Sequence, residues 1–168
     1  VYLRPLNKET DAPECQRMLS DPYIRQFIEQ DLPITLESEK SWMESMENDD
    51  HNAPLAIIDL NSHTFLGIIG LHNINWRYGV ATSGTLIGKE EFRAGGYGTD
   101  AKMLQLKYAF LTLGLRKVRA GVFEHNNASL ALLEKTGYKR VGRYYKEVFK
   151  EGEYRDVVLL EVFREDWE

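Results

Sequence analysis

The sequence predicts one α/β domain over residues 1–168, with a mixed, mostly antiparallel central sheet flanked by helices. Apolar residues alternate in stretches typical of β-strands, and between some of these stretches they recur at helical spacing. Some predicted strands follow one another through short turns, as in antiparallel hairpins, whereas others are separated by a helix. The length is that of a chain with one hydrophobic core rather than two.

The first fifty residues predict one short strand and two helices. We expect the strand at residues 1–6, "VYLRPL", and the helices at about 8–20 and 35–48. Thr35 can cap the second helix through its side-chain oxygen. Acidic residues follow Thr35 in the first turn, where a helix favours negative charge.

Three strands are expected next. "PLAIIDL" at 54–60 and "TFLGIIGLHNINW" at 64–76 flank the turn-like "NSH" and predict a hairpin. "VATSGTLIG" at 80–88 predicts a third strand beside it. These three strands therefore form one antiparallel part of the predicted sheet.

The second half of the chain alternates between helices and strands. Apolar residues at helical spacing over 101–115 predict a long amphipathic helix. We then expect a buried strand at 117–123 and a helix at 126–137. An antiparallel pair at 138–149 and 154–163 closes the chain.

The composition is that of an ordinary soluble domain, with 43% hydrophobic and 28% charged residues. No apolar run reaches the ~20 residues of a membrane helix, and the first residues are unlike a signal peptide. We therefore expect a cytoplasmic protein with no membrane association. Cys15 is the single cysteine and has no ligand at metal spacing nearby, so we expect it to pack in the core and expect no metal site.

The net charge of −5 is unevenly distributed. Residues 1–50 contain twelve acidic and five basic side chains, a net of −7, whereas residues 51–168 contain fourteen acidic and sixteen basic ones, a net of +2. This distribution is unlike that of a nucleic-acid-binding protein, which needs clustered Lys and Arg. It indicates either a cationic partner for the acidic part or simply a solvated acidic surface.

The stretch "RAGGYGTDA" at 93–101 is the strongest functional signal. Its glycines permit positive φ and close backbone approach, and it leads into a helix whose first N–H groups have no internal partner. Such a helix start binds phosphate oxygens, with Arg93 adding positive charge and Thr99 a hydroxyl. The simpler interpretation is a glycine-rich turn without a ligand.

Two other phosphate-binding patterns agree less well with the sequence. "GYGTDA" satisfies the short dinucleotide-binding fingerprint, but "KEEFRA" separates it from the preceding strand. The region where that fingerprint requires an acidic residue contains "RKVR" instead. A Walker-type loop is excluded because no G-K-S/T sequence follows the glycines.

The arrangement resembles the GNAT superfamily of acyl-CoA-dependent N-acyltransferases. Residues 93–98 match its R/Q-x-x-G-x-G/A pyrophosphate loop, and "ATSGTLIGKEEF" resembles the strand before that loop. "FEHNNASLALLEKTGY" resembles a later strand, asparagine and helix, and the closing hairpin and opening "LRPL" extend the resemblance over nearly the whole chain. The branch it most resembles contains ribosomal-protein N-terminal acetyltransferases, with spermidine and aminoglycoside acetyltransferases as relatives.

The resemblance implies acetyl-CoA as the cosubstrate. Its pyrophosphate would bind at the glycine loop, its pantetheine arm would pair with the backbone of residues 86–88, and Asn126 and Ser129 would bond from the other side. Asn126 can also cap the helix that follows it, and the two roles are compatible. The implied coenzyme-binding residues are Leu86, Ile87, Gly88, Arg93, Ala94, Gly95, Gly96, Tyr97, Gly98, Thr99, Asn126 and Ser129.

Direct acyl transfer needs a neutral amine, donors for the oxyanion and a proton for the departing thiolate. Glu124 and His72, each near a predicted strand end, are the candidate bases, and the backbone amides after Thr85 are the candidate oxyanion donors. Many family members have a tyrosine where this chain has Leu133, so the resemblance points to Ser129 as the candidate acid. Each of these polar side chains also has a structural alternative, which for Ser129 is a hydrogen bond at the helix end.

The sequence therefore predicts an acetyl-CoA-dependent N-acetyltransferase that moves an acetyl group directly to a primary amine. The expected acceptor is a protein N-terminal α-amine, a polyamine or another small cationic amine, and a homodimer is left open. The alternative is a non-catalytic acyl-CoA-binding module. An α-amine with a pKa near 8 costs about 1.4 kcal/mol to deprotonate at pH 7, whereas an amine near 10.4 costs about 4.6 kcal/mol and needs a base.

Overall fold

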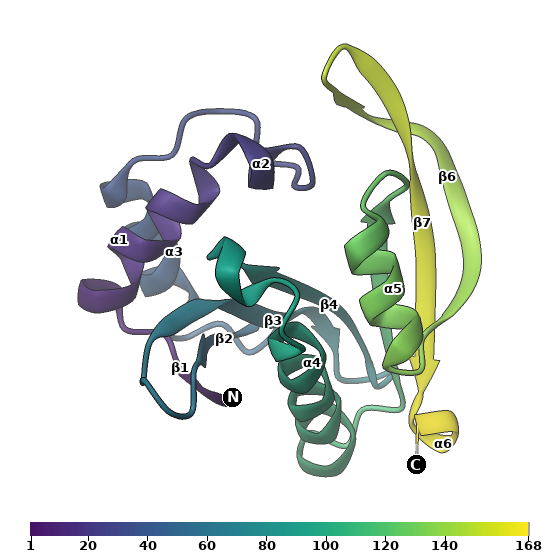
Figure 1. Cartoon of the computed structure of the whole chain (residues 1–168). Helices are drawn as coiled ribbons and strands as arrows, with labels where there is room; N and C mark the ends of the chain where they lie inside the picture. The colour runs from purple at the N-terminus through teal and green to yellow at the C-terminus, as the bar shows by residue number, and fades with distance from the viewer. Residues whose placement is uncertain (168) are drawn as a thin grey trace.

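The computed structural model describes residues 1–167, and Figure 1 shows a curved central sheet with helices packed against it. Within these residues seven strands form one sheet in the spatial order β1-β2-β3-β4-β5-β7-β6. The strands are Tyr2–Pro5 (β1), Ala53–Ile58 (β2), Phe65–Asn75 (β3), Val80–Ile87 (β4), Lys117–Phe123 (β5), Lys139–Lys150 (β6) and Glu153–Phe163 (β7). The helices are Lys8–Leu19 (α1), Pro22–Arg25 (α2), Leu36–Met46 (α3), Tyr97–Lys107 (α4), Asn127–Lys135 (α5) and Arg164–Trp167 (α6).

The predicted fold class, a mixed and mostly antiparallel sheet flanked by helices, is confirmed. Among the described strands, β4 and β5 form the one parallel pair, and residues 80–82 lie opposite residues 117–119. Beyond Thr82 the two strands diverge, while β4 stays paired with β3 as far as Ile87 and β5 with β7 as far as Phe123. The sheet therefore opens between β4 and β5, and each half keeps its own ladder of hydrogen bonds.

Two apolar clusters attach the helices to opposite faces of the sheet. Leu106 of α4 and Leu133 of α5 belong to a cluster with β5 and β7. Cys15 of α1 and Met43 of α3 belong to the other cluster, which reaches Leu86 of β4. Because successive side chains of a strand point to opposite faces, neighbouring residues of β4 contact different sets of helices. The burial of Cys15 confirms that it packs in the core.

The starts of α1 and α3 follow the local capping chemistry. The Asn7 side chain accepts hydrogen bonds from the backbone N–H groups of Glu9 and Thr10 and so begins α1. The predicted cap at Thr35 is confirmed, because its hydroxyl accepts from the Ser38 N–H and the Ser38 hydroxyl accepts from the Thr35 N–H. These reciprocal bonds satisfy two helix-end donors at once.

Three short elements were not predicted from the sequence: helix α2, the 3₁₀ turn Glu90–Phe92 and helix α6. Segments this short show no measurable periodicity, although Asp21 caps α2 and Pro22 stands at its first position. The helix predicted over 101–115 begins earlier, and its α-helical part ends at Lys107. A π-helical turn, Tyr108–Thr112, completes it.

The β6–β7 hairpin extends past the body of the sheet, and β6 forms an exposed edge (Figure 1). Lys150 ties this hairpin to the segment after α2, because its ammonium donates to the Arg25 carbonyl and pairs with Asp31. The hairpin and α2 thus approach each other beyond the opening in the sheet. None of the helices in residues 1–167 is long and apolar enough to cross a membrane.

Candidate active site

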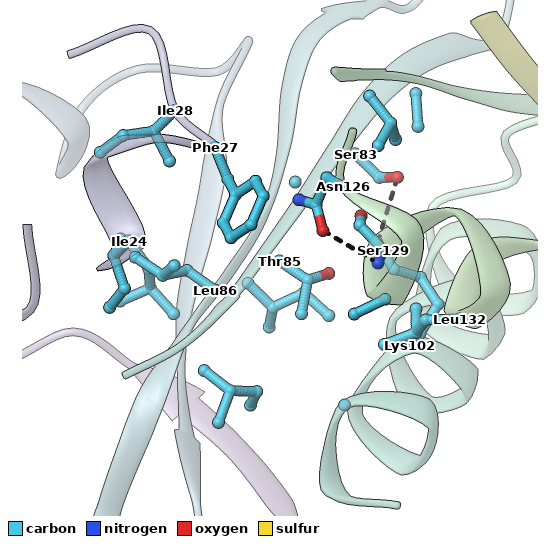
Figure 2. A pocket seen from close by; sticks show the side chains of 18 of the residues that line it. Ile24, Phe27, Ile28, Ser83, Thr85, Leu86, Lys102, Asn126, Ser129 and Leu132 are labelled. Atoms are coloured by element: carbon cyan, nitrogen blue, oxygen red, sulfur yellow. Dashed lines mark hydrogen bonds between the residues drawn. The ribbon is translucent and has the colours of Figure 1, made fainter. Parts of the chain in front are cut away.

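A cavity of about 810 Å³ occupies the opening between β4 and β5. Figure 2 shows Thr85 and Leu86 of β4 on one side of it and Ser129 of α5 on the other. Within the described residues, the stretch of β4 at 83–87 has no strand partner on the side that faces β5. Its free backbone groups can therefore pair with a bound ligand.

Gly96 precedes helix α4 and has a φ of +82°, a conformation that favours glycine. A Cβ at Gly96 would meet no atom of residues 1–167 within 4 Å, so these residues leave the space at the helix start open. Gly96, Gly98 and Thr99 line the cavity, and the first N–H groups of α4 have no partner within the helix. This helix start fits a phosphate group of coenzyme A.

The other two glycines of the loop pack against neighbouring side chains. A Cβ at Gly98 would lie 2.7 Å from Cδ1 of Leu132, and one at Gly95 would lie 2.6 Å from the Tyr97 ring. Gly98 is therefore needed for the close approach of α4 to α5, whatever it also contributes to phosphate binding. Ala94 lines the cavity, whereas Gly95 and Tyr97 lie just outside its wall.

Arg93 is folded back onto the protein. Its guanidinium donates to the Gly88 carbonyl at 2.8 Å, lies 4.4 Å from the centre of the Tyr23 ring and is 3.5 Å from Asp21. It therefore connects the glycine loop to α2 while it lines the cavity. Lys135, in the last turn of α5, also lines the cavity and adds a positive charge that no sequence motif indicated.

The predicted pantetheine strand divides into two parts. Leu86 and Ile87 line the cavity, and Gly88 lies outside the wall. The Gly88 N–H donates to the Leu66 carbonyl at 2.8 Å and its own carbonyl accepts from Arg93. Both backbone groups of Gly88 thus already have protein partners. Leu86 lies opposite Ile68, two residues along the ladder from the bonded pair of Gly88 and Leu66, so its backbone groups also face β3, and Ile87 is left as the better candidate for pairing.

Asn126 caps helix α5, as the structural alternative suggested. Its Oδ1 accepts a hydrogen bond from the Ser129 N–H at 3.2 Å, and Figure 2 shows this bond beside the cavity. Both residues line the cavity, so a contact with coenzyme A stays a prediction for each. The capping bond fixes where the first turn of α5 places the Ser129 hydroxyl.

The two candidate bases lie in different surroundings. His72 lines the cavity, and burial together with the charge of Lys102 lowers its pKa, so its imidazole is neutral at pH 7. Glu124 lies outside the cavity wall, where its carboxylate accepts from the Asp156 N–H at 3.1 Å and approaches Arg143 at 3.5 Å. This geometry favours His72 as the base and gives Glu124 a role in fastening β5 to the hairpin.

The Thr85 hydroxyl is buried and has no hydrogen-bond partner within residues 1–167. It lines the cavity on the side of the free β4 edge. A buried hydroxyl without a partner costs about 1–3 kcal/mol, so a polar ligand atom at this position would remove an existing penalty. The orphaned hydroxyl lies beside the residues whose backbone amides are the candidate oxyanion donors.

Lys102 is a cavity residue that the sequence analysis missed. It is 1% exposed, and its Nζ donates to Ser83 Oγ at 3.2 Å and to Gln105 Oε1 at 2.9 Å. The Ser83 hydroxyl also bonds to the Tyr138 hydroxyl at 2.8 Å. Within the described residues no carboxylate pairs with Lys102, and burial lowers its pKa to about 7. One sequence signal could have indicated its burial: Lys102 lies one helical turn before Leu106, on the same face of the predicted helix.

Six of the twelve acidic residues in the first fifty are paired with nearby cations. Glu39 differs, because it is 7% exposed, lines the cavity and has an Oε2 with no partner in the described part of the chain. Burial raises the pKa of its carboxyl group. The paired acids are Asp11 with Arg4, Glu44 with Lys8, Glu14 with Arg17, Glu9 with Lys40, Asp21 with Arg93 and Asp31 with Lys150.

The chain matches a protein-family model over most of its length. Residues 1–139 match the model described as an acetyltransferase (GNAT) domain. The chain belongs to the GNAT family. A GNAT protein is an acyltransferase with acetyl-CoA as its donor, so the predicted enzyme class and cosubstrate are confirmed, and the non-catalytic binding module is set aside.

Relatives in Bacillus subtilis are named as N-acetyltransferases. The chain is 26% identical over 151 residues to "SPbeta prophage-derived uncharacterized N-acetyltransferase YokL", covering 89% of this chain and 83% of YokL. It is 29% identical over 175 residues to "Probable N-acetyltransferase YjcK", covering 99% of this chain and 95% of YjcK. YdaF, provisionally named a ribosomal N-acetyltransferase, is 30% identical over 102 residues, 61% of this chain and 55% of YdaF. The ribosomal branch therefore stays a prediction.

The GNAT fold of this chain is similar to that of a solved polyamine-modifying enzyme. The spermidine N-acetyltransferase of Vibrio cholerae, in complex with CoA and spermine, aligns with a TM-score of 0.92 at 20% identity. The alignment covers 99% of this chain and 96% of the other. At this identity the similarity establishes the shared fold.

Gly96→Ala tests the phosphate site, with Gly114→Ala as a matched control. Both glycines have positive φ and open space around the position of a Cβ, but Gly114 is outside the cavity wall. Each substitution should cost about 1–2 kcal/mol of stability through backbone strain. Gly96→Ala alone should also weaken acetyl-CoA binding by about tenfold or more, measured by calorimetry. Equal acetyl-CoA affinity in the two variants would place the phosphate elsewhere.

The burial of Lys102 predicts a specific dependence of stability on pH. The folded-state pKa is about 7, below the ordinary lysine value of 10.5, so between these pH values the unfolded chain holds a proton that the folded chain has lost. The free energy of unfolding should therefore rise with pH, by up to about 1.4 kcal/mol per unit. Below the folded-state pKa of about 7, both the folded and the unfolded chain hold the proton. The free energy of unfolding then carries the full cost of burying the charge and no longer changes with pH through Lys102.

Urea unfolding of the wild type and of Lys102→Met at several pH values between 7 and 10 measures this effect. The difference between the two stabilities should shift in favour of the wild type as the pH rises. Lys107→Met, an exposed lysine of the same helix, is the matched control and should follow the wild type. Parallel curves for Lys102→Met and the wild type would show that Lys102 titrates normally.

Proposed function

We propose that this GNAT protein acetylates the primary amine of a substrate with one positive charge and an apolar body. The observation that carries the proposal is the Glu39 carboxylate in the cavity wall, buried and with an unpaired oxygen. An ammonium group would supply the missing partner. A charged hydrogen bond of this kind contributes about 1.5–3 kcal/mol.

The charges of the cavity wall support a single ammonium in the acceptor. Within residues 1–167, Glu39 is the one acidic side chain that lines the cavity. A polyamine brings several ammonium groups into the cavity, and each unpaired one would be desolvated at a cost. Arg93 and Lys135 line the same cavity and provide the charge that suits an anionic coenzyme instead.

The walls near α2 and α3 support an apolar body in the acceptor. Ile24, Phe27 and Ile28 lie together on the side of the cavity opposite α5, as Figure 2 shows. Trp42 of α3 and Tyr23 of α2 add aromatic surface. Burying apolar substrate surface here gains roughly 25 cal/mol per Å², which complements the single charged contact.

Deprotonation of the acceptor is the remaining chemical requirement. A neutral His72 in the wall can accept the proton of an incoming ammonium, directly or through water. The cost that the base must offset is about 4.6 kcal/mol for an alkylamine at pH 7 and about 1.4 kcal/mol for an α-amine. Alkylamines and α-amines must therefore both be tested as acceptors.

The test measures free thiol released from acetyl-CoA with a panel of amines at one pH. The panel contains alkyl- and arylalkylamines, spermidine, aminoglycosides and peptides with apolar first residues. We expect the highest kcat/KM with monocationic amines that carry an apolar group. A polyamine as the best acceptor would contradict the single-charge argument, and turnover with none of the amines would contradict the proposed function.

Glu39→Gln tests the ammonium contact, and Glu37→Gln is the matched control, because Glu37 is an exposed residue of the same helix. Glu39→Gln should raise KM for the amine roughly 10- to 100-fold, the equivalent of one charged hydrogen bond, and leave KM for acetyl-CoA unchanged. Because burial raises the Glu39 pKa, KM for the amine should also rise in the wild type as the pH falls through that pKa. Glu39→Gln with the kinetics of Glu37→Gln would remove Glu39 from the acceptor site.

A further inference from the structure

We propose that Lys102, acting through the Ser83 hydroxyl, supplies the proton that the coenzyme A thiolate takes up when the acetyl group leaves. The inference rests on the acetyl transfer proposed above and names the source of one proton in it. It concerns Lys102 and Ser83, which the sequence analysis did not select.

Ser83 and Lys102 lie at the closed end of the opening in the sheet. Ser83 is the first residue of β4 beyond the parallel pairing with β5, and both residues line the cavity. The bond between Lys102 Nζ and Ser83 Oγ, 3.2 Å long, is drawn in Figure 2. Lys102 is thus 1% exposed and still connected to the cavity through one hydroxyl.

Ser83 shares a side of β4 with Thr85, because residues two apart on a strand point to the same face. Two residues of an antiparallel strand span about 7 Å. The unpaired Thr85 hydroxyl marks the expected position of the acyl group, and Ser129 of α5 lies across the cavity from it (Figure 2). Ser83 is therefore the next hydroxyl toward the closed end, within reach of a thiolate directly or through one water.

Packing alone does not account for a lysine at this position. In the described residues the partners of its Nζ are the neutral oxygens of Ser83 and Gln105, and no carboxylate offsets its charge. An apolar side chain would fill the same space without the cost of burying an ammonium. A role in exchanging protons with a substrate in the cavity does explain why a lysine is buried at this position.

The direction of proton transfer follows from the acidities. Burial lowers the pKa of Lys102 to about 7. An alkyl thiol has a pKa of about 8.5, so transfer from the Lys102 ammonium to the thiolate is favourable. Taking a proton from an alkylamine near 10.4 would be unfavourable by about three pH units, so Lys102 is better suited as an acid than as a base. Within residues 1–167 the Ser129 hydroxyl has no ionised hydrogen-bond partner; the observed bond of Ser129 to Asn126 is made by its backbone N–H.

The proposed step conserves atoms and charge. The neutral amine forms a C–N bond to the thioester carbon, and the C–S bond breaks with its electron pair on sulfur. Sulfur takes the Ser83 hydroxyl proton while Ser83 takes one from Nζ, which leaves neutral Lys102 and the free thiol. The amide nitrogen loses its extra proton to solvent, and Lys102 recovers a proton from solvent before the next turnover.

The titratable neighbours of Lys102 are compatible with this role. Tyr138, from the segment after α5, bonds to Ser83, and burial raises its pKa so that it stays protonated. His72 of β3 has a pKa lowered by burial and by the charge of Lys102, so it is neutral when Lys102 is charged. Gln105, on the same helix, carries no charge. Within residues 1–167, Lys102 is therefore the group of this cluster that changes its proton near neutral pH.

The pH dependence of kcat with saturating substrates tests the proposal in three variants. The wild type should lose activity above the Lys102 pKa, approaching tenfold per pH unit. Lys102→Met and Ser83→Ala should lower kcat at pH 7 by about 100-fold, remove this alkaline limb and change KM for acetyl-CoA little. Tyr138→Phe is the matched control, because it removes a hydroxyl from the same cluster but keeps Lys102 and Ser83 joined, and it should keep the limb and most of kcat.

A second readout does not depend on turnover. NMR of the protein labelled with ¹³C at lysine Cε should show one resonance that titrates near neutral pH and is missing from Lys102→Met. An unchanged alkaline limb in Lys102→Met would overturn the proposal. If Lys102→Met does not fold, an unchanged limb in Ser83→Ala would overturn it. A Lys102 resonance that titrates near pH 10 would also overturn it. Absence of turnover in the wild type would instead refute the proposed function, so the two failures are distinguishable.

Discussion

The divergence of β4 from β5 after three residue pairs is the constraint on which the rest of the structure depends. A continuous ladder would satisfy the backbone of both strands and leave no cavity. Here each strand keeps a partner on its outer side, β3 for β4 and β7 for β5, so the sheet tolerates the opening. The free edge of β4 and the first turns of α4 and α5 then face one space, and the chemistry of a GNAT enzyme needs all three.

The glycine loop shows how this geometry is maintained. Gly96 leaves the start of α4 open, whereas Gly98 lets α4 approach Leu132 of α5. Gly96 thus leaves room for a ligand, whereas Gly98 allows two helices to pack closely. Arg93 fixes the loop from outside by bonding to Gly88 and lying over Tyr23 of α2. The phosphate end of the cavity is therefore coupled to the segment that borders the acceptor end.

The sequence predicted the order of the strands and longer helices, because apolar period and turn residues are local signals. It also located the glycine loop, since positive φ and a helix start leave a pattern in a few consecutive residues. It did not identify Glu39 or Lys102 as cavity residues. Both are charged residues on helices that contain many charges, and only the packing of α3 and α4 against the sheet shows that these two are buried. Lys135 was also missed, because nothing in the sequence shows that this exposed lysine of α5 lines the cavity.

Glu124 shows a second limit of prediction from sequence, because it was selected as a site residue and is bonded elsewhere in the structure. Its place near a strand end suggested a base, but pairing of β5 with β7 brings it to the Asp156 N–H and to Arg143. That contact joins residues 32 positions apart, so no local pattern could reveal it. A strand end predicts where a side chain can be accessible, whereas the neighbouring strand decides whether the side chain is already engaged.

The two buried charged residues that line the cavity, Glu39 and Lys102, are explained together. Burial raises the pKa of Glu39 and lowers that of Lys102, so each residue resists its charged form while the cavity holds no ligand. The proposed chemistry gives each of them a partner of opposite charge, an ammonium for Glu39 and a thiolate for Lys102. Stability is then lowest in the free enzyme and is recovered as substrates bind, because a ligand that binds only the folded state stabilises it. Placing both groups in one cavity therefore links the cost of their burial to the reaction itself.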